Sequence, residues 1–178
     1  MAPGVSVVGM MRSLMAATSA IMSLAVHKNE TPFEIARDLA PVTLVSAPPY
    51  ILVAHPSVPA KNAAELIAHA KANPGKLTYG STGTGGITHL ATELFDIMAG
   101  TKMTHVPYKG TGPAITDVLG GQVQLIFGAM PAMVPQHKSG RLRGIGVTTG
   151  KRVPAIPDIP TIGETIPGYE AVLWYGAW

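Results

Sequence analysis

The sequence predicts an α/β fold with a mostly parallel sheet. Short apolar runs rich in β-branched residues alternate with helical segments, and loops that contain Gly or Pro separate them. Strand–loop–helix units repeated at this rhythm are typical of a parallel sheet with helices on its faces. The chain has 178 residues, 47% of them hydrophobic, which suits one domain of about 150 residues or one domain and part of another.

The expected elements follow in a regular order. Strands are expected at 42–45 and 50–54 (with a break at Pro48 and Pro49), 77–79, 103–106, 123–127, 142–148 and 169–178. Helices are expected at 60–72, 87–99, 113–119 and 131–138. In the helix over 87–99, the apolar stripe predicted to face the core consists of Leu90, Leu94, Ile97 and Met98. Gly100 is the expected C-cap of this helix.

The composition argues against several classes of function. A net charge of +3 comes from 13 Lys and Arg against 10 Asp and Glu, with no cluster of basic residues, which argues against nucleic acid as a partner. The absence of Cys excludes disulfides, zinc–thiolate sites and thiol catalysis. The His, Asp and Glu residues are not spaced as metal ligands, and no Ser stands in a G-x-S-x-G elbow. We therefore predict no catalytic residue, no metal and no cofactor.

An apolar run over 13–26 could be part of a targeting segment. Its 14 residues are fewer than the roughly 20 that a membrane-spanning helix needs. Arg12 precedes the run as in a secretory signal, but it is a single charge, and no small-x-small cleavage site stands cleanly before His27. The alternative is a strand and turn within 5–22 that belong to a globular domain whose preceding part is missing.

The segment 79–86 is the most informative for function. It follows a predicted strand and opens a predicted helix, so backbone N–H groups and the helix dipole converge there. Its glycines let the backbone approach a ligand and nearby hydroxyls add donors: Gly80, Gly83, Gly85 and Gly86, with Ser81, Thr82, Thr84 and Thr88. This pattern suits a phosphate or carboxylate, and a Gly-rich connection with an N-cap explains it equally well. It matches neither the Walker A loop nor the G-x-G-x-x-G fingerprint.

Other candidate residues lie near this segment in the predicted fold. His89 could face a ligand, but a hydrogen bond to a neighbouring strand is its commoner role, and His105 at a strand end is expected to be structural. Tyr108 and Lys109 follow a predicted strand, where ligands of α/β sheets collect. Lys109 could neutralise a carboxylate, or it could be an exposed lysine at a loop tip.

A longer series of motifs resembles a known family. The motifs are YGSTGxGGxxHLA over 79–91, HVPYKG over 105–110, DVLGGQV over 117–123, KSGRLR over 138–143, PDIPT over 157–161 and PGYE over 167–170. In this order they resemble the extracytoplasmic solute receptors of tripartite tricarboxylate transporters, the Bug or TctC-like family. The resemblance covers roughly residues 15–178.

The resemblance implies a type II periplasmic-binding-protein-like fold, in which two α/β domains close on a ligand. The implied domains are a remnant of the first domain at 1–40, one complete ligand-binding α/β domain at 41–173, and the start of a crossover to the first domain at 174–178. The chain would then be truncated at both ends. The implied carboxylate-binding residues are Gly80, Ser81, Thr82, Gly83, Gly85, Gly86, His89, Tyr108 and Lys109.

The same resemblance implies a receptor rather than an enzyme. Its ligand would be a small organic carboxylate, such as a di- or tricarboxylate, its partners the membrane components of the transporter, and its location the periplasm. Weakened binding is expected of a partial form, because one of the two domains that close on a ligand keeps only part of the contacts to it. Many relatives carry Asp where Gly128 stands, which makes amino acids less expected as ligands. Two alternatives stay open: an enzyme acting on a carboxylated or phosphorylated metabolite at the Gly-rich loop, and a non-functional gene remnant.

Overall fold

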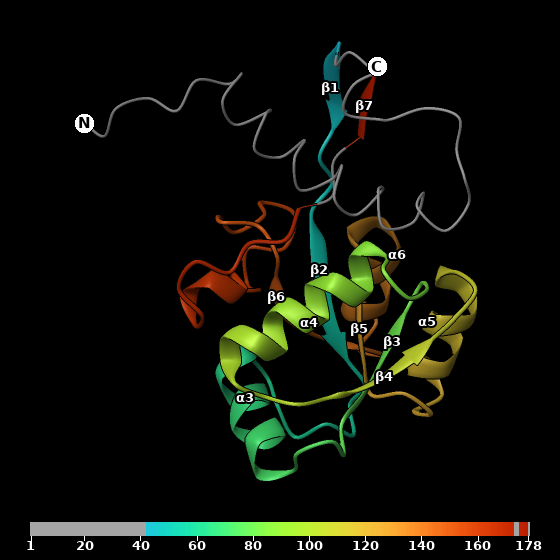
Figure 1. Cartoon of the computed structure of the whole chain (residues 1–178), viewed down its shortest axis with the longest axis vertical. Helices are drawn as coiled ribbons and strands as arrows, with labels where there is room; N and C mark the ends of the chain where they lie inside the picture. The colour runs from blue at the N-terminus through green and yellow to red at the C-terminus, as the bar shows by residue number, and fades with distance from the viewer. Residues whose placement is uncertain (1–41, 173–174, 178) are drawn as a thin grey trace. The chain divides into compact units, whose positions relative to one another are not determined.

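The computed structural model describes residues 42–172 and 175–177 (Figure 1). These residues fall into two compact units, one with 42–46 and 175–177 and the other with 47–172. The predicted first-domain remnant at 1–40, the apolar run over 13–26 and the alternative strand and turn within 5–22 lie outside the described residues. In the described part of the chain, no helix combines the length and apolar character that a membrane span requires.

The smaller unit contains one antiparallel strand pair. Strand β1 (Thr43–Ser46) pairs with β7 (Tyr175–Ala177), and Thr43 lies opposite Ala177. The break expected at the two prolines is confirmed, because β1 and β2 (Tyr50–Ala54) belong to different sheets. The strand predicted over 169–178 is wrong in extent, since 169–172 form no strand and β7 is only 3 residues long.

The larger unit is built on a five-stranded sheet in the order β4-β3-β5-β2-β6. Its strands are β2, β3 (Thr78–Ser81), β4 (Thr104–Pro107), β5 (Leu125–Ala129) and β6 (Arg143–Val147). Strand β3 runs parallel to β4 and β5, whereas β2 runs antiparallel to β5 and β6. Four strands therefore share one direction and β2 opposes them, which confirms the mostly parallel sheet.

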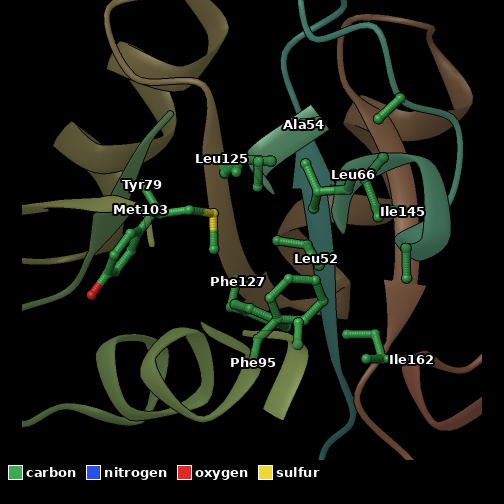
Figure 2. Close-up of a cluster of buried hydrophobic side chains, with 14 of the residues drawn as sticks. Leu52, Ala54, Leu66, Tyr79, Phe95, Met103, Leu125, Phe127, Ile145 and Ile162 are labelled. Atoms are coloured by element: carbon green, nitrogen blue, oxygen red, sulfur yellow. The ribbon is translucent and has the colours of Figure 1, made fainter. Parts of the chain in front are cut away.

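Helices cover both faces of this sheet. They are α3 (Ala63–Ala72), α4 (Ile87–Ala99), α5 (Thr111–Leu119) and α6 (Met130–Lys138), followed by a 3₁₀ turn, η1 (Ile162–Glu164). Successive strand side chains point to opposite faces, so β2 contributes Leu52 to one core and Ile51 to the other. The first core joins the sheet to α3 and α4, and its Phe95, Phe127 and Leu52 are drawn in Figure 2. The second core joins the sheet to α5 and α6.

Helix α4 has the predicted bounds but buries a different face from the one predicted. Ile97 is 77% exposed and Met98 is 38% exposed, whereas Leu90 and Leu94 are half-buried. The buried positions of α4 are Thr88, Ala91, Thr92, Phe95, Asp96 and Ala99. The expectation that this stripe faces the core is therefore wrong for Ile97 and Met98, whereas Leu94 packs against the first core.

The polar members of the buried face have local hydrogen-bond partners. The Thr92 hydroxyl donates to the backbone carbonyl of Thr88 at 2.8 Å. The Asp96 carboxylate accepts the Met103 backbone N–H at 2.7 Å and also the Thr101 hydroxyl. Pairing offsets the cost of burying these polar groups, and Phe95 contributes the largest apolar side chain of the buried face of α4. Gly100 ends α4 in the left-handed conformation with φ 63°, as predicted.

Candidate functional site

Three helix N-termini meet at one edge of the sheet. Strands β3, β4 and β5 are parallel neighbours, and α4, α5 and α6 follow them in the chain. The N-caps are Gly86, Gly110 and Ala129, and within the described residues none of these helix starts has a side-chain cap. Backbone N–H groups and the positive ends of the helix dipoles therefore collect at the carboxyl edge of the sheet, an arrangement that favours an anion.

The Gly-rich loop between β3 and α4, residues 82–86, is held in place by buried hydroxyls on either side of it. Ser81 is fully buried, and its Oγ lies 2.6 Å from His105 Nε2 while accepting the Gly83 N–H at 3.2 Å. The Thr88 Oγ1 accepts the Thr82 N–H at 2.9 Å. Gly83 and Gly85 adopt positive φ values of 134° and 81°. Ser81 and Thr88 thus fix the path of the backbone and leave donation toward a ligand to other groups of the loop.

Tyr108 supports this loop from the side of β4. The Tyr108 ring packs beside Gly80, where an added Cβ would lie 3.4 Å from Tyr108 Cε2, at van der Waals contact. The Tyr108 N–H donates to the Ser81 carbonyl at 3.0 Å, and its hydroxyl donates to Asp117 Oδ2 at 2.7 Å. Burial and this hydrogen bond raise the pKa of Tyr108 to about 12. Lys109, the next residue, is exposed.

A cluster of ionisable rings lies beside the loop. His105 stands opposite Tyr79 in the β3–β4 register, and their ring centroids are 5.0 Å apart. The His89 ring lies 4.2 Å from that of His105, and the Tyr79 hydroxyl donates to Glu93 Oε1 at 2.5 Å. Burial lowers the pKa of His105, and the neighbouring His89 lowers it further. Burial and the bond to Glu93 raise the pKa of Tyr79, so Tyr79 and His105 are neutral near pH 7.

The structure brings the predicted site residues to one edge of the sheet but gives them different degrees of exposure. Gly85 and Lys109 are exposed, Thr82, Gly83, Gly86, His89 and Tyr108 are half-buried, and Gly80 and Ser81 are buried. Among the described residues, no group of His, Asp and Glu could hold a metal ion. Hollows of about 300 and 370 Å³ lie elsewhere, and no predicted binding residue lines them.

Two further N-termini at this edge were not predicted as part of the site. They begin at Gly110 and Ala129, the N-caps of α5 and α6. Their sequence signal is a strand followed by a helix either directly, as in β5 and α6, or after three residues, as in β4 and α5. Each of these strands neighbours β3. That neighbourhood is a property of the strand order, which the local sequence does not reveal.

Comparison with known proteins identifies the family. Residues 12–178 match the family model described as "Tripartite tricarboxylate transporter family receptor", TctC. The chain belongs to this family. It is 36% identical over 145 residues to Protein BugT of Bordetella pertussis, which covers 81% of this chain and 44% of BugT. It is 35% identical over 147 residues to a UPF0065 protein of Pseudomonas sp., covering 82% of this chain and 44% of the relative.

Solved structures confirm the periplasmic-binding-protein fold. "R. palustris Rpa4515 with adipate" shares 38% identity with a TM-score of 0.76, covering 83% of this chain and 50% of that chain. MatC (Rpa3494) from Rhodopseudomonas palustris with bound malate shares 26% identity with a TM-score of 0.74 and the same two coverages. "Periplasmic binding protein BugD" shares 35% identity with a TM-score of 0.71, covering 76% of this chain and 46% of that chain.

The family and its fold are those of solute-binding receptors rather than enzymes, in agreement with the prediction. This finding removes the support for the enzyme alternative at the Gly-rich loop. The chain spans about half the length of these solved structures and less than half the length of these curated relatives.

Proposed function

We propose that this chain binds a carboxylate group of a small organic acid at the carboxyl edge of its five-stranded sheet, as part of a TctC-family solute receptor. The observation that carries the proposal is the Gly-rich loop at the uncapped start of α4, in a family whose solved members include proteins with adipate and malate. Carboxylates fit this site because backbone N–H groups at a helix N-terminus donate to anions.

The proposed binding residues divide into two groups by their exposure. Gly80, Ser81 and Tyr108 are proposed to shape the loop, because their side chains or backbones are engaged in the packing and hydrogen bonds described above. The residues proposed to face the carboxylate are Thr82, Gly83, Gly85, Gly86, His89 and Lys109. The N–H groups of Gly83, Gly85 and Gly86 already donate to partners at this loop, so a carboxylate would compete for these bonds. Lys109 supplies positive charge.

The proposed setting is the periplasm, where the chain would deliver its ligand to the membrane components of a tripartite tricarboxylate transporter. The description of the family and the name of BugD support this setting. We also propose weaker binding than in the longer relatives, of which the chain spans about half. The described residues contact a ligand from one side only. Water then competes for the hydrogen bonds to the anion, and this lowers their net contribution to binding.

Isothermal titration calorimetry of the full chain with adipate, malate and citrate tests the proposal. The sharpest variant is Gly85→Ala, and its matched control is Gly140→Ala. Gly85 and Gly140 have φ values of 81° and 74°, and a Cβ at either would meet no atom within 4 Å. Alanine strains both turns by about 1 kcal/mol, so the two variants have similar stability, but only Gly85 belongs to the loop.

The proposal expects a carboxylate to bind the wild type and Gly140→Ala with the same affinity, and Gly85→Ala several-fold more weakly. No heat and no chemical-shift change with any of the three acids at millimolar concentration would contradict it. Equal binding by both variants would place the site away from this loop.

A further inference from the structure

The ring of His89 closes the Gly-rich loop through a hydrogen bond that requires one protonation state. The Gly85 N–H donates to His89 Nδ1 at 3.3 Å. A nitrogen that accepts a hydrogen bond carries no proton, so His89 is neutral in this arrangement and holds its proton on Nε2. That nitrogen lies 3.9 Å from Glu93 Oε1, and the His89 side chain keeps 18% of its surface exposed. A solvent proton can therefore reach the ring.

The groups that face His89 decide which of the two neighbouring histidines takes up a proton. His105 from β4 lies 4.2 Å away by ring centroids, Tyr79 from β3 lies 6.4 Å away, and Glu93 comes from the same helix. His105 is bonded to the buried Ser81 hydroxyl, and burial lowers its pKa. Tyr79 stays neutral and the Glu93 carboxylate favours a cation beside it. Of the two rings, His105 is therefore the one held neutral, and His89 is the one that faces both a carboxylate and solvent.

We propose that carboxylate binding at this loop is coupled to the uptake of one proton by His89. The inference rests on the proposed function, because a carboxylate at the start of α4 competes with His89 for the Gly85 N–H. When this N–H turns to the ligand, its bond to Nδ1 breaks and a bond to a carboxylate oxygen forms. His89 Nδ1 then takes a proton from solvent and becomes a donor itself, and the imidazolium charge balances the charge of the carboxylate.

The sign of the pH dependence follows from linkage. An anion beside a histidine ring favours the protonated form and so raises the pKa of such a ring, which means that the ligand-bound state would hold more protons. Affinity therefore rises as the pH falls through the raised pKa, by about tenfold for each unit by which the ligand shifts it. Over pH 8 to 6 the carboxylic acids stay ionised, because their own pKa values lie near about 4.3. We expect adipate to bind about three- to tenfold more tightly at pH 6 than at pH 8.

The test combines calorimetry and NMR on the full chain with adipate as the probe. Titrations at pH 7 in two buffers of different ionisation enthalpy measure how many protons are taken up on binding. The imidazole carbon–proton signals give the pKa of His89 with and without adipate, and this readout needs no variant. The test variant is His89→Asn, whose side-chain oxygen can still accept the Gly85 N–H but does not titrate.

His137 provides a matched control on another part of the sheet. Its Nδ1 accepts the Gly144 N–H at 3.1 Å and its Nε2 lies 3.5 Å from Asp158. His137 thus has the same pair of contacts as His89, but it lies near the C-terminal end of α6, away from the Gly-rich loop. His137→Asn should therefore keep the proton uptake that His89→Asn abolishes.

The proposal is supported by uptake of about 0.3 to 0.6 proton at pH 7, which is what a three- to tenfold change in affinity over two pH units requires. It is also supported by a raised His89 pKa with adipate and by binding to His89→Asn that no longer depends on pH. Adipate binding with no proton uptake and an unshifted His89 pKa would overturn it and leave the proposed function intact. Proton uptake that persists in His89→Asn would also overturn it. Absence of adipate binding at every pH would instead overturn the proposed function for this ligand, and the coupling with it.

Discussion

Replacement of Ser81 by alanine tests how the Gly-rich loop is held. The hydroxyl is fully buried, lies 2.6 Å from His105 Nε2 and accepts the Gly83 N–H at 3.2 Å. Its removal leaves a ring nitrogen and a backbone N–H without their partner. A partly buried polar group that loses its partner costs about 1–3 kcal/mol, and the half-buried His105 and Gly83 can recover part of this from water.

We expect Ser81→Ala to lower the free energy of unfolding by about 2 kcal/mol. For a unit of this size that corresponds to a fall in Tm of about 6–8 °C. Thermal unfolding followed by circular dichroism at 222 nm measures the change. Ser139→Ala is the control, because the Ser139 hydroxyl donates to a backbone carbonyl at 3.1 Å from an exposed position; its expected change is below about 0.5 kcal/mol. Equal Tm shifts for the two variants would refute the assignment of Ser81 as the internal support of the loop.

Three further predictions concern the packing and electrostatics of the larger unit. Gly128→Ala places a Cβ 2.2 Å from Met133 Cε and 2.7 Å from its Cγ, so it should lower the free energy of unfolding by about 1–3 kcal/mol. In chemical denaturation, the double variant with Met133→Ala should lose less free energy of unfolding than the two single variants lose in total. Phe95→Ala should cost about 3–5 kcal/mol and Ile97→Ala less than about 0.5 kcal/mol, and the reverse order in urea unfolding would contradict the face assigned to α4. Hydrogen bonds to Arg152 lower the pKa of Glu164 to about 2. The Tm difference between wild type and Glu164→Gln should therefore be present at pH 6 and shrink as the pH falls from about 4.5 toward 2. A Tm difference that stays constant over this range would contradict the pairing.

Local signals account for the parts of the fold that the sequence predicted. The helix over 87–99 was predicted with the bounds that α4 has, because a Gly-rich turn precedes it and Gly100 supplies the left-handed C-cap. The break at the prolines likewise separates β1 from β2. These features depend on the backbone preferences of single residues, which are readable without knowledge of the fold.

The buried face of α4 could not be predicted by the same means. Two stripes of this helix are compatible with burial, and the one that is buried carries threonines and Asp96. Asp96 is tolerated there because it accepts the Met103 N–H, a contact made by the turn into β4. Apolar periodicity favours the stripe with Ile97 and Met98, because the pattern of apolar residues carries no information on whether a buried polar side chain has a hydrogen-bond partner.

The candidate site shows the same limit. The Gly-rich loop was visible in the sequence, and so was a structural role for His105. The contact between Ser81 and His105 was not, because it depends on the parallel pairing of β3 with β4. The antiparallel direction of β2 and the convergence of three helix N-termini are also products of strand order, which is set by the packing of the whole sheet.

The most direct test of the proposed function is a titration of the full, ¹⁵N-labelled chain with adipate, followed by amide chemical shifts. A carboxylate that binds at the start of α4 should move the amides of 82–89 in a saturable manner, while the turn at Gly140 stays in place. Saturable shifts confined to residues outside the carboxyl edge of the sheet would contradict the proposed site. A complete lack of shifts at millimolar adipate, malate and citrate would contradict carboxylate binding by this chain.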